Sequence, residues 1–236
     1  ARFSTMNQQL ALAIQLKNQA HLTSFCWSQN TILKHEMELT LAGKGERFLY
    51  IWGALGTGKS HLLQGVCHRY SQQNTAAIYL PLRLLREWGP QSIESLSNQA
   101  LIVIDDIDTI AGHAEWEKAL FDLYNQVHDN GHSLLLTSNN LTPAASAIQL
   151  PDLRSRLNWG LVMQLKELDD ASKMLVLQEQ ARKRGFDLSD AVALFLIHRC
   201  TRNMNDLQHI IDRLDHESLA AQRKVTIPFV KSVLAI

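Results

Sequence analysis

A glycine-rich segment carries the clearest chemical signal in the sequence. Residues 53–60 read Gly-Ala-Leu-Gly-Thr-Gly-Lys-Ser and match the pattern G-x-x-x-x-G-K-[ST]. They follow an apolar run at residues 48–52 and precede a helical stretch at residues 61–70, which is the context that a phosphate-binding loop needs. Backbone N–H groups of such a loop surround phosphate oxygens, while the lysine neutralises their charge and the hydroxyl binds Mg²⁺. The segment therefore predicts a nucleotide site with Lys59 on the β- and γ-phosphates and Ser60 as a metal ligand.

Two adjacent acids end another apolar run. Residues 101–104 are followed by Asp105 and Asp106. Some 45 residues after a phosphate-binding loop, this pair predicts that Asp105 coordinates Mg²⁺ and that Asp106 polarises a water molecule. The alternative is a turn or a helix cap. Asp106 is shorter than the glutamate often found at this position in vigorous ATPases, so we do not expect efficient water activation.

Two polar positions give weaker signals. Asn139 ends a buried run that starts at Leu134, and carboxyl ends of parallel strands meet at one edge. Asn139 is therefore a candidate to contact a γ-phosphate or an attacking water, although an ordinary turn residue fits equally well. Arg156 lies in an arginine-bearing turn far along the chain from the glycine-rich loop. It could stabilise phosphate charge on a neighbouring subunit, but two arginines on a short helix more often form a solvated face.

Short apolar runs, separated by stretches long enough for helices, predict the strands that position these residues. The runs lie at residues 48–52, 76–80, 101–104, 133–136 and 161–165. Apolar residues at helical spacing in residues 115–130, before Gly131, predict a helix packed on the sheet. Later in the chain only helices are expected, with starts indicated by Asp169, Ser189, Asn203 and Pro228. The fold class is α/β: a three-layer α/β/α parallel sheet followed by a small all-helical domain.

Composition and charge exclude several functional classes. Lysine and arginine number 23, as do aspartate and glutamate, so the net charge of zero gives no reason to expect avid non-specific binding to DNA or to an anionic membrane. No apolar run approaches the ~18 residues that span a bilayer. The three cysteines fit neither a disulfide framework nor a zinc site. We therefore expect a cytoplasmic protein without a membrane partner.

The N-terminal segment contains alternating apolar residues. Gln9, Leu10, Leu12 and Ile14 could bind an apolar groove as an extended peptide. A docked strand or the start of a helix is the commoner structure for such a composition.

Together these motifs resemble the AAA+ ATPases of the DnaA clade over nearly the whole chain. The resemblance is carried by residues 58–63, 104–107, 121–125, 135–139 and 150–160, which look like the boxes of that clade in order. Within the clade the chain looks most like the regulators of the initiator, because it stops after the lid and has no room for a helix-turn-helix domain. Its N-terminal peptide is also similar to the QLxLPL type that binds the DNA polymerase sliding clamp, with Ala13 in place of the usual proline.

The resemblance implies an AAA+ P-loop NTPase with three parts. These are an N-terminal segment with the clamp-binding peptide (1–20), a nucleotide-binding α/β domain (21–167) and a helical lid (168–236). It implies roles for Asp105 and Asp106 as the Walker B acids, Asn139 as sensor 1 and Arg156 as the arginine finger. The nucleotide-binding residues that it implies are Gly53, Gly56, Thr57, Gly58, Lys59, Ser60, His61, Phe25, Trp27 and Asn30. One departure is Asn205, which stands where the clade carries the sensor 2 arginine, so we expect a weaker influence of the γ-phosphate on the lid.

The implied activity is stimulation in trans of the hydrolysis of ATP bound by the DnaA initiator, which prevents re-initiation of DNA replication. The chain would hold ADP or ATP with Mg²⁺, have weak intrinsic ATPase activity, and reach duplex DNA only through the clamp, the β subunit of DNA polymerase III. Homo-oligomerisation and base selectivity are left open. Two alternatives are an adaptor that recruits DnaA and an autonomous ATPase similar to helicase loaders.

Overall fold

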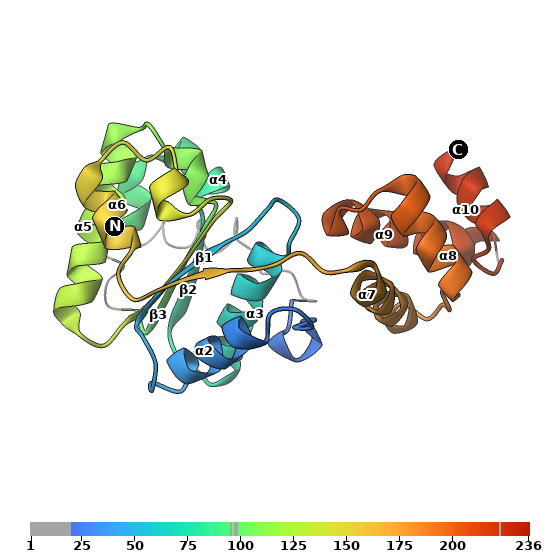
Figure 1. Cartoon of the computed structure of the whole chain (residues 1–236), viewed down its shortest axis with the longest axis horizontal. Helices are drawn as coiled ribbons and strands as arrows, with labels where there is room; N and C mark the ends of the chain where they lie inside the picture. Colours follow the sequence, from blue (N-terminus) through green and yellow to red (C-terminus); the bar gives the residue numbers. More distant parts are fainter. Residues whose placement is uncertain (1–19, 95, 97–98, 222) are drawn as a thin grey trace, which may run out of the picture. The chain divides into compact units, whose positions relative to one another are not determined.

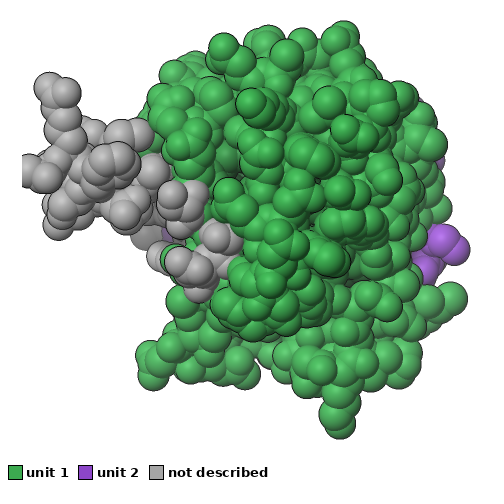
Figure 2. Space-filling model, turned by 90° about the vertical axis from the view of Figure 1, so that its left-hand side faces the viewer, with its two compact units in different colours: residues 1–25, 30–54, 59–165 green, residues 26–29, 55–58, 166–236 purple. Residues whose placement is uncertain are grey.

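The computed structural model describes residues 20–94, 96, 99–221 and 223–236. The described chain forms two compact units, coloured separately in Figure 2. The first contains residues 20–25, 30–54 and 59–165, and the second contains residues 26–29, 55–58 and 166–236. The proposed clamp-binding residues Gln9, Leu10, Leu12 and Ile14 lie outside the described residues.

The first unit is an α/β/α sandwich around a parallel sheet (Figure 1). Its strands are β1 (Phe48–Trp52), β2 (Ala77–Pro81), β3 (Leu101–Asp105), β4 (Leu134–Asn139) and β5 (Leu161–Gln164). In the described residues the sheet order is β2-β3-β4-β1-β5. Its α-helices are α2 (Thr31–Leu41), α3 (Lys59–Gln72), α4 (Leu82–Leu85), α5 (Ala114–Asn130) and α6 (Pro151–Leu157). Short 3₁₀ helices lie at Leu22–Ser24, Arg86–Trp88, Pro90–Ile93, Ile107–Ile110 and Pro143–Ala145.

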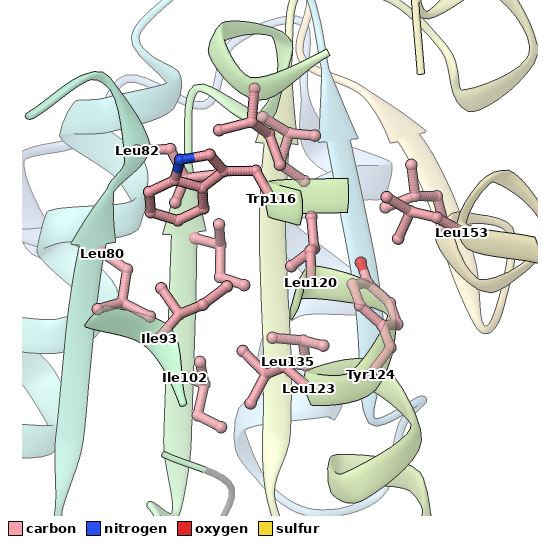
Figure 3. Close-up of a cluster of buried hydrophobic side chains, with 14 of the residues drawn as sticks. Leu80, Leu82, Ile93, Ile102, Trp116, Leu120, Leu123, Tyr124, Leu135 and Leu153 are labelled. Carbon is pink, nitrogen blue, oxygen red and sulfur yellow. The ribbon is translucent and has the colours of Figure 1, made fainter. Parts of the chain in front are cut away.

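The central strands explain why this sheet must be covered on both faces. Every residue of β3 and β4 is buried, as expected for parallel strands that lie between two helical layers. On one face, α5 packs its apolar stripe against the sheet, with Trp116, Leu120 and Leu123 over β3 and β4 (Figure 3). Because the parallel strands point the same way, their carboxyl ends form one edge of the sheet and their amino ends form the other.

The second unit is helical. It contains α7 (Asp170–Lys183), α8 (Asp190–Phe195), a π-helical turn (Leu196–Cys200), α9 (Met204–Ala221) and α10 (Ile227–Leu234). The side chains of Asp169, Ser189 and Thr226 cap α7, α8 and α10 respectively, each by accepting a backbone N–H. Leucines and other apolar residues of all four helices form one buried cluster.

The observed fold class confirms the predicted parallel α/β architecture with a helical segment after it. β4 extends beyond the apolar run at residues 133–136. Its last three residues, Thr137 to Asn139, are polar, yet they are buried and their backbone pairs with β1. The π-helical turn after α8 was not predicted, since nothing in the side-chain periodicity marks a local change in backbone hydrogen bonding.

Candidate functional site

Polar side chains meet at the carboxyl edge of the sheet in the first unit. β3 ends at Asp105 and β4 ends at Asn139, and α3 begins at Lys59 after the loop that follows β1. Because β1 and β3 both pair with β4, parallel in each case, these three positions share one edge. The fold thus brings together residues that are 80 positions apart in the sequence.

Lys59 lies almost entirely inside the protein, with 6% of its surface exposed. Its Nζ donates hydrogen bonds to Gly53 O (2.7 Å), Ala54 O (3.0 Å) and Asn140 Oδ1 (3.1 Å). An ammonium group has three hydrogens, so the loop and Asn140, the residue after β4, together engage all of them. Burial lowers the pKa of Lys59, and the carboxylates of nearby acids, Asp105 first among them, oppose that shift. A phosphate at this position would have to replace at least one of these acceptors.

Asp105 is buried and held on both of its oxygens. Tyr79 Oη donates to Oδ2 at 2.6 Å, while Ser138 Oγ and the backbone N–H of Asp106 donate to Oδ1. Burial, followed by the nearby Asp105 carboxylate, raises the pKa of Tyr79, so the phenol remains a hydrogen-bond donor at neutral pH. A carboxylate has about four acceptor positions, and three on Asp105 are used by described groups. One position on Oδ2 is left for a metal ion or for a water bound to it.

Asp106 differs from Asp105 in both backbone and side chain. Its backbone is left-handed, with φ 58°, and its Oδ2 accepts from Arg83 Nε at 3.2 Å. Burial raises the pKa of Asp106, and so does the charge of Asp105, whereas the Arg83 guanidinium opposes the increase. The carboxylate lies beside the predicted metal ligand, as a group that polarises water requires.

Two adjacent asparagines, Asn139 and Asn140, add further polar side chains to this edge. Asn139 is 1% exposed, and no described group in hydrogen-bonding geometry accepts from its Nδ2 atom. The neighbouring Tyr50 hydroxyl donates instead to Leu141 O at 2.8 Å. Asn140 links Lys59 to Asp108, whose Oδ2 accepts from Asn140 Nδ2 at 2.8 Å. The buried amide of Asn139 is placed at the edge where it could donate to a phosphate or a water.

The loop glycines have backbone conformations that other residues rarely adopt. Gly56 and Gly58 have φ of 84° and 98°. Gly53 donates its N–H to Asn139 O at 3.3 Å, which ties the start of the loop to β4. Within the second unit, a Cβ on Gly56 would lie 2.6 Å from Nδ2 of Asn203, so a side chain at this position would also require the Asn203 side chain to move. The buried Thr57 lies between the two positive-φ glycines.

The residues implied to hold the base and ribose belong to both units. The rings of Phe25 and His61 lie 5.9 Å apart within the first unit, and Asn30, just before α2, is buried there. Trp27 belongs to the second unit.

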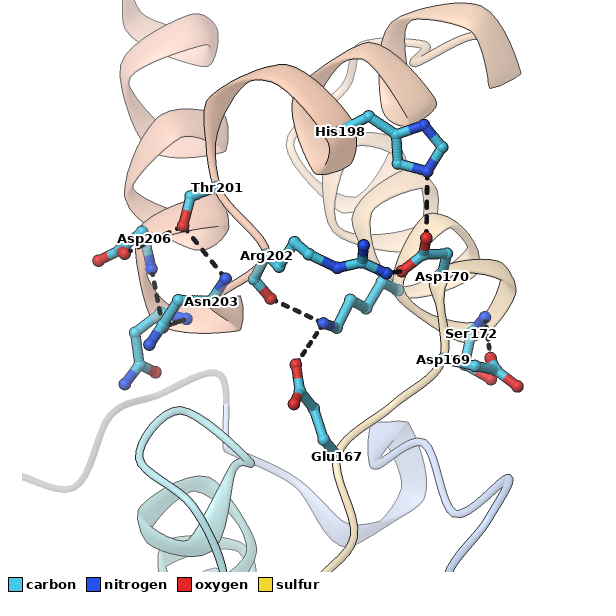
Figure 4. A network of polar contacts seen from close by, with 11 residues as sticks. Glu167, Asp169, Asp170, Ser172, His198, Thr201, Arg202, Asn203 and Asp206 are labelled. Carbon is cyan, nitrogen blue, oxygen red and sulfur yellow. Dashed lines mark hydrogen bonds and ion pairs between the residues drawn. The ribbon is translucent and has the colours of Figure 1, made fainter.

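Asn205 lies in the first turn of α9 and its side chain is exposed. Hydrogen bonds hold this end of α9. Asn203 Oδ1 accepts from Asn205 N at 2.9 Å. Thr201 Oγ1 accepts from Asn203 N at 3.1 Å (Figure 4). The buried Lys173 fixes the preceding loop by donating to Arg202 O at 2.7 Å and to Glu167. An uncharged amide therefore stands at the predicted sensor 2 position.

The donor set at the carboxyl edge fits a magnesium nucleotide. Mg²⁺ prefers oxygen ligands, retains several waters and is usually held by one or two carboxylates together with phosphates. Asp105 supplies a carboxylate, and the Ser60 hydroxyl lies in the first turn of α3. No cluster of three or more His, Cys, Asp or Glu residues suited to a metal occurs in the described part of the chain. The ion would therefore take most of its ligands from phosphates and water.

Arg156 is held in an aromatic cage rather than lying on a solvated face. Its Nε donates to Asn125 Oδ1 at 2.8 Å. The guanidinium carbon lies 4.1 Å from the ring centre of Trp159 and 5.3 Å from that of Phe121. Among the described residues nothing accepts a hydrogen bond from Nη1 or Nη2. The arginine is thus fixed in place with its outer donors available, an arrangement suited to phosphate.

This cage lies at the amino edge of the sheet, opposite Lys59. The Trp159 ring lies 5.6 Å from that of Phe48, the first residue of β1, and β5 starts two residues after Trp159. Lys59 follows the other end of β1. At roughly 3.3 Å per residue, the two ends of this strand are about 13 Å apart. Arg156 is therefore not part of the phosphate site of its own chain.

Comparison with known proteins identifies the family. Over 229 residues the chain is 42% identical to an uncharacterised protein of Haemophilus influenzae, and the alignment covers 97% of this chain and 99% of that protein. A family model for the lid domain of Hda matches residues 169–234, and one for the bacterial DnaA ATPase domain matches residues 86–164. The chain belongs to the Hda-like family of DnaA-homologous AAA+ proteins.

Solved structures agree with the fold of this Hda-like chain. Domain III of the Thermotoga maritima replication initiation protein DnaA has a TM-score of 0.81 at 21% identity, covering 94% of this chain and 98% of that one. DnaA from Aquifex aeolicus with bound AMPPCP has a TM-score of 0.69 at 18% identity, covering 88% and 68%. The chain is a DnaA-like AAA+ protein related to replication, with an Hda-type lid. No described helix is long and apolar enough to cross a membrane.

Several contacts of this Hda-like protein were not singled out from the sequence. Tyr79, Ser138, Arg83 and Asn140 contact the predicted residues at the carboxyl edge, yet their own spacing carries no motif. Two residues of the cage around Arg156, in contrast, have a spacing that can be read in the sequence. Phe121 and Asn125 are four residues apart on a helix and so lie on one face of it.

Proposed function

We propose that this chain is a regulator tethered to the sliding clamp, which stimulates hydrolysis of DnaA-bound ATP in trans and so negatively regulates initiation of DNA replication. The observation that supports this most is the position of Arg156. The guanidinium is held by Asn125, Phe121 and Trp159 at the sheet edge opposite Lys59. An arginine fixed away from its own phosphate site, with two outer donors available, suits a phosphate held by another protein.

In this proposal the carboxyl edge holds a nucleotide that stays bound. Lys59 and the N–H groups of the glycine-rich loop bind the phosphates of ADP or ATP, and Ser60 and Asp105 hold Mg²⁺. Mg²⁺ would neutralise phosphate charge. Asp106 and Asn139 would orient water, and the aspartate makes intrinsic hydrolysis weak. Asn205, which is uncharged, gives the lid little response to a γ-phosphate.

Two partners follow from the proposal. DnaA supplies the ATP on which Arg156 acts. The β subunit of DNA polymerase III binds the peptide containing Gln9, Leu10, Leu12 and Ile14, so that the neutral chain reaches duplex DNA only through the clamp. The tether and the arginine therefore have separate tasks.

Turnover of DnaA-bound ATP, measured with and without clamp loaded on DNA, tests the proposal. Arg156→Ala should reduce the stimulated rate by about 10³-fold or more, since an arginine finger contributes about 10³ to 10⁵. Arg154→Ala, on the same helix, is the matched control and should retain stimulation. Clamp binding should be unchanged in both variants and lost when Leu10 and Leu12 are changed to Ala. Full stimulation by Arg156→Ala would refute the mechanism.

The carboxyl edge also supports a second candidate, an autonomous ATPase similar to helicase loaders. Lys59, Asp105, Asp106 and Asn139 share one edge, as turnover of the chain's own ATP requires. Robust hydrolysis by the purified chain without DnaA, unaffected by Arg156→Ala, would favour this candidate.

A further inference from the structure

Glu117 is a buried acid with no cation beside it. It is 1% exposed, and no described lysine, arginine or histidine lies within ion-pair distance of its carboxylate. Three backbone N–H groups satisfy it instead. Gly112 N donates to Oε1 at 2.7 Å, Leu150 N donates to Oε2 at 2.7 Å, and Gln149 N lies 3.0 Å from both oxygens. Buried carboxylates are costly, so one retained without a counter-charge calls for a structural or functional reason.

Two of the three donors, Gln149 and Leu150, belong to the segment that starts α6, the helix that carries Arg156. Leu150 is the N-cap residue of α6, and its side chain makes no capping hydrogen bond. Glu117 therefore fixes the entrance to α6 from a neighbouring helix, α5, which lies alongside α6 (Figure 1). Gly112, just before α5, and Gln149 and Leu150, at the start of α6, present their N–H groups to the carboxylate.

The same face of α5 holds the other end of α6. Glu117, Phe121 and Asn125 are spaced by four residues, so they lie in one row along the helix. Glu117 contacts the backbone before α6, while Phe121 and Asn125 contact the Arg156 side chain near its end. Since α6 has only seven residues, these two attachments define its direction.

We propose that Glu117 is a positioning residue for Arg156, because its carboxylate sets where α6 begins and thereby where the guanidinium points. The inference rests on the proposed action of Arg156 in trans. Glu117 touches neither nucleotide nor partner phosphate; it acts through the backbone of Gln149 and Leu150.

Glu117→Gln tests this with almost no change of shape. An amide group replaces one of the two oxygens by a donor, so at least two of the four N–H···O contacts are lost. We expect amide hydrogen exchange at Gln149 and Leu150 to accelerate at least tenfold in the isolated chain. The stimulated rate of DnaA-bound ATP hydrolysis at saturation should fall by about 10- to 100-fold, as misplacement of a catalytic group does. The concentration for half-maximal stimulation should change by less than about twofold.

Tyr124→Phe is the matched control. Tyr124 also lies on α5 and is buried, but its hydroxyl donates to Thr137 Oγ1 of β4 at 3.2 Å, on the sheet side of the helix (Figure 3). It should retain stimulation and the exchange rates of residues 149 and 150. A similar loss of stimulation in both variants would overturn the positioning role, because general weakening of α5 would then explain it.

A second pair of variants changes Leu150, the donor in this contact, and leaves the Glu117 carboxylate intact. Leu150 has φ −71°, which suits proline, so Leu150→Pro removes its N–H without opposing that dihedral angle. Leu150→Ala removes the same packing but keeps the donor. Loss of stimulation in Leu150→Pro beyond that in Leu150→Ala supports the inference, and equal activities overturn it.

The two proposals fail in different ways. Full stimulation by Arg156→Ala overturns the proposed function and the inference with it. Loss of stimulation with Arg156→Ala, but not with Glu117→Gln, overturns the positioning role alone. In the Arg156→Ala background, Glu117→Gln should cause no further loss of stimulation, and an additional loss would show that it acts elsewhere.

Discussion

Tyr79→Phe should weaken the fold and strengthen the metal site at the same time. The phenol donates at 2.6 Å to Oδ2 of the buried Asp105 and accepts from Gln64 Nε2 at 3.2 Å. Hydrogen bonds to charged groups contribute about 1.5–3 kcal/mol each. We therefore expect the free energy of unfolding of the first unit to fall by about 1.5–3 kcal/mol. For a unit of this size, this lowers Tm by roughly 3–12 °C.

The effect on Mg²⁺ has the opposite sign because of the number of acceptor positions on Asp105. Tyr79 uses one of the two positions on Oδ2, so its removal leaves both for a metal ion or for a water bound to it. The gain in ADP affinity caused by Mg²⁺ should increase by at least about fivefold, equivalent to about 1 kcal/mol. A fluorescent ADP analogue titrated with and without Mg²⁺ measures this gain, and thermal unfolding of the ligand-free protein measures the loss.

Tyr50→Phe serves as the control for both measurements. It removes a hydrogen bond to Leu141 O, also from a buried phenol, and leaves the donors to Asp105 in place. Its Tm should fall, but the effect of Mg²⁺ on ADP binding should stay at the wild-type value. If Tyr79→Phe instead weakens the Mg²⁺ effect, the hydroxyl supports the metal site rather than competing with it, and the reasoning is refuted.

Three further predictions concern a glycine and a cysteine of the first unit. Gly160→Ala should destabilise it by about 2–4 kcal/mol in urea unfolding, because φ is 68° and a Cβ would lie 2.2 Å from Phe48 O. Gly131→Ala, at φ 73° with nothing within 4 Å, should cost only about 1 kcal/mol, and equal losses would contradict this reasoning. Burial raises the pKa of Cys67 to about 12. At pH 8 iodoacetamide should therefore modify Cys67 at least tenfold more slowly than Cys26 in the folded protein. Mass spectrometry of peptides from the alkylated protein measures both rates. Because the folded thiol keeps its proton while the unfolded one loses it above about pH 9, Cys67 should also make stability fall as pH rises from 9 towards 12.

The strands and the acids at their ends could be predicted because each depends on local sequence. An apolar run such as residues 101–104 indicates a buried parallel strand, and the residue after it must lie at the carboxyl edge. The partners of that residue depend on register between strands. Tyr79 contacts Asp105 because β2 pairs with β3 such that Tyr79 lies opposite Val103, two residues before the acid, and the phenol spans the remaining distance. No spacing within either strand contains that information.

The sequence gives the helical spacing of Phe121 and Asn125, but it does not show that these residues contact Arg156, for a similar cause. Two arginines on a short helix suggested a solvated face, but α6 packs against α5 and places Arg156 over Trp159 and Phe121. Glu117 joins α5 to the start of α6 through backbone N–H groups, yet nothing in the sequence distinguishes this buried acid from a surface one. Long-range contacts between helices, rather than the propensity of either helix, determine this part of the molecule.

The parallel sheet gives the first unit a direction, and that direction governs how such units can join. Lys59 lies at one edge of the sheet and the Arg156 cage lies at the other. An interface that brings the arginine edge of one unit to the phosphate edge of another therefore uses two different surfaces, so it is heterologous. After one such contact, one unit still has an unused phosphate edge and the other still has an unused arginine edge. Head-to-tail joining of this kind extends until the two ends meet in a ring or until a subunit with a covered or altered edge ends it.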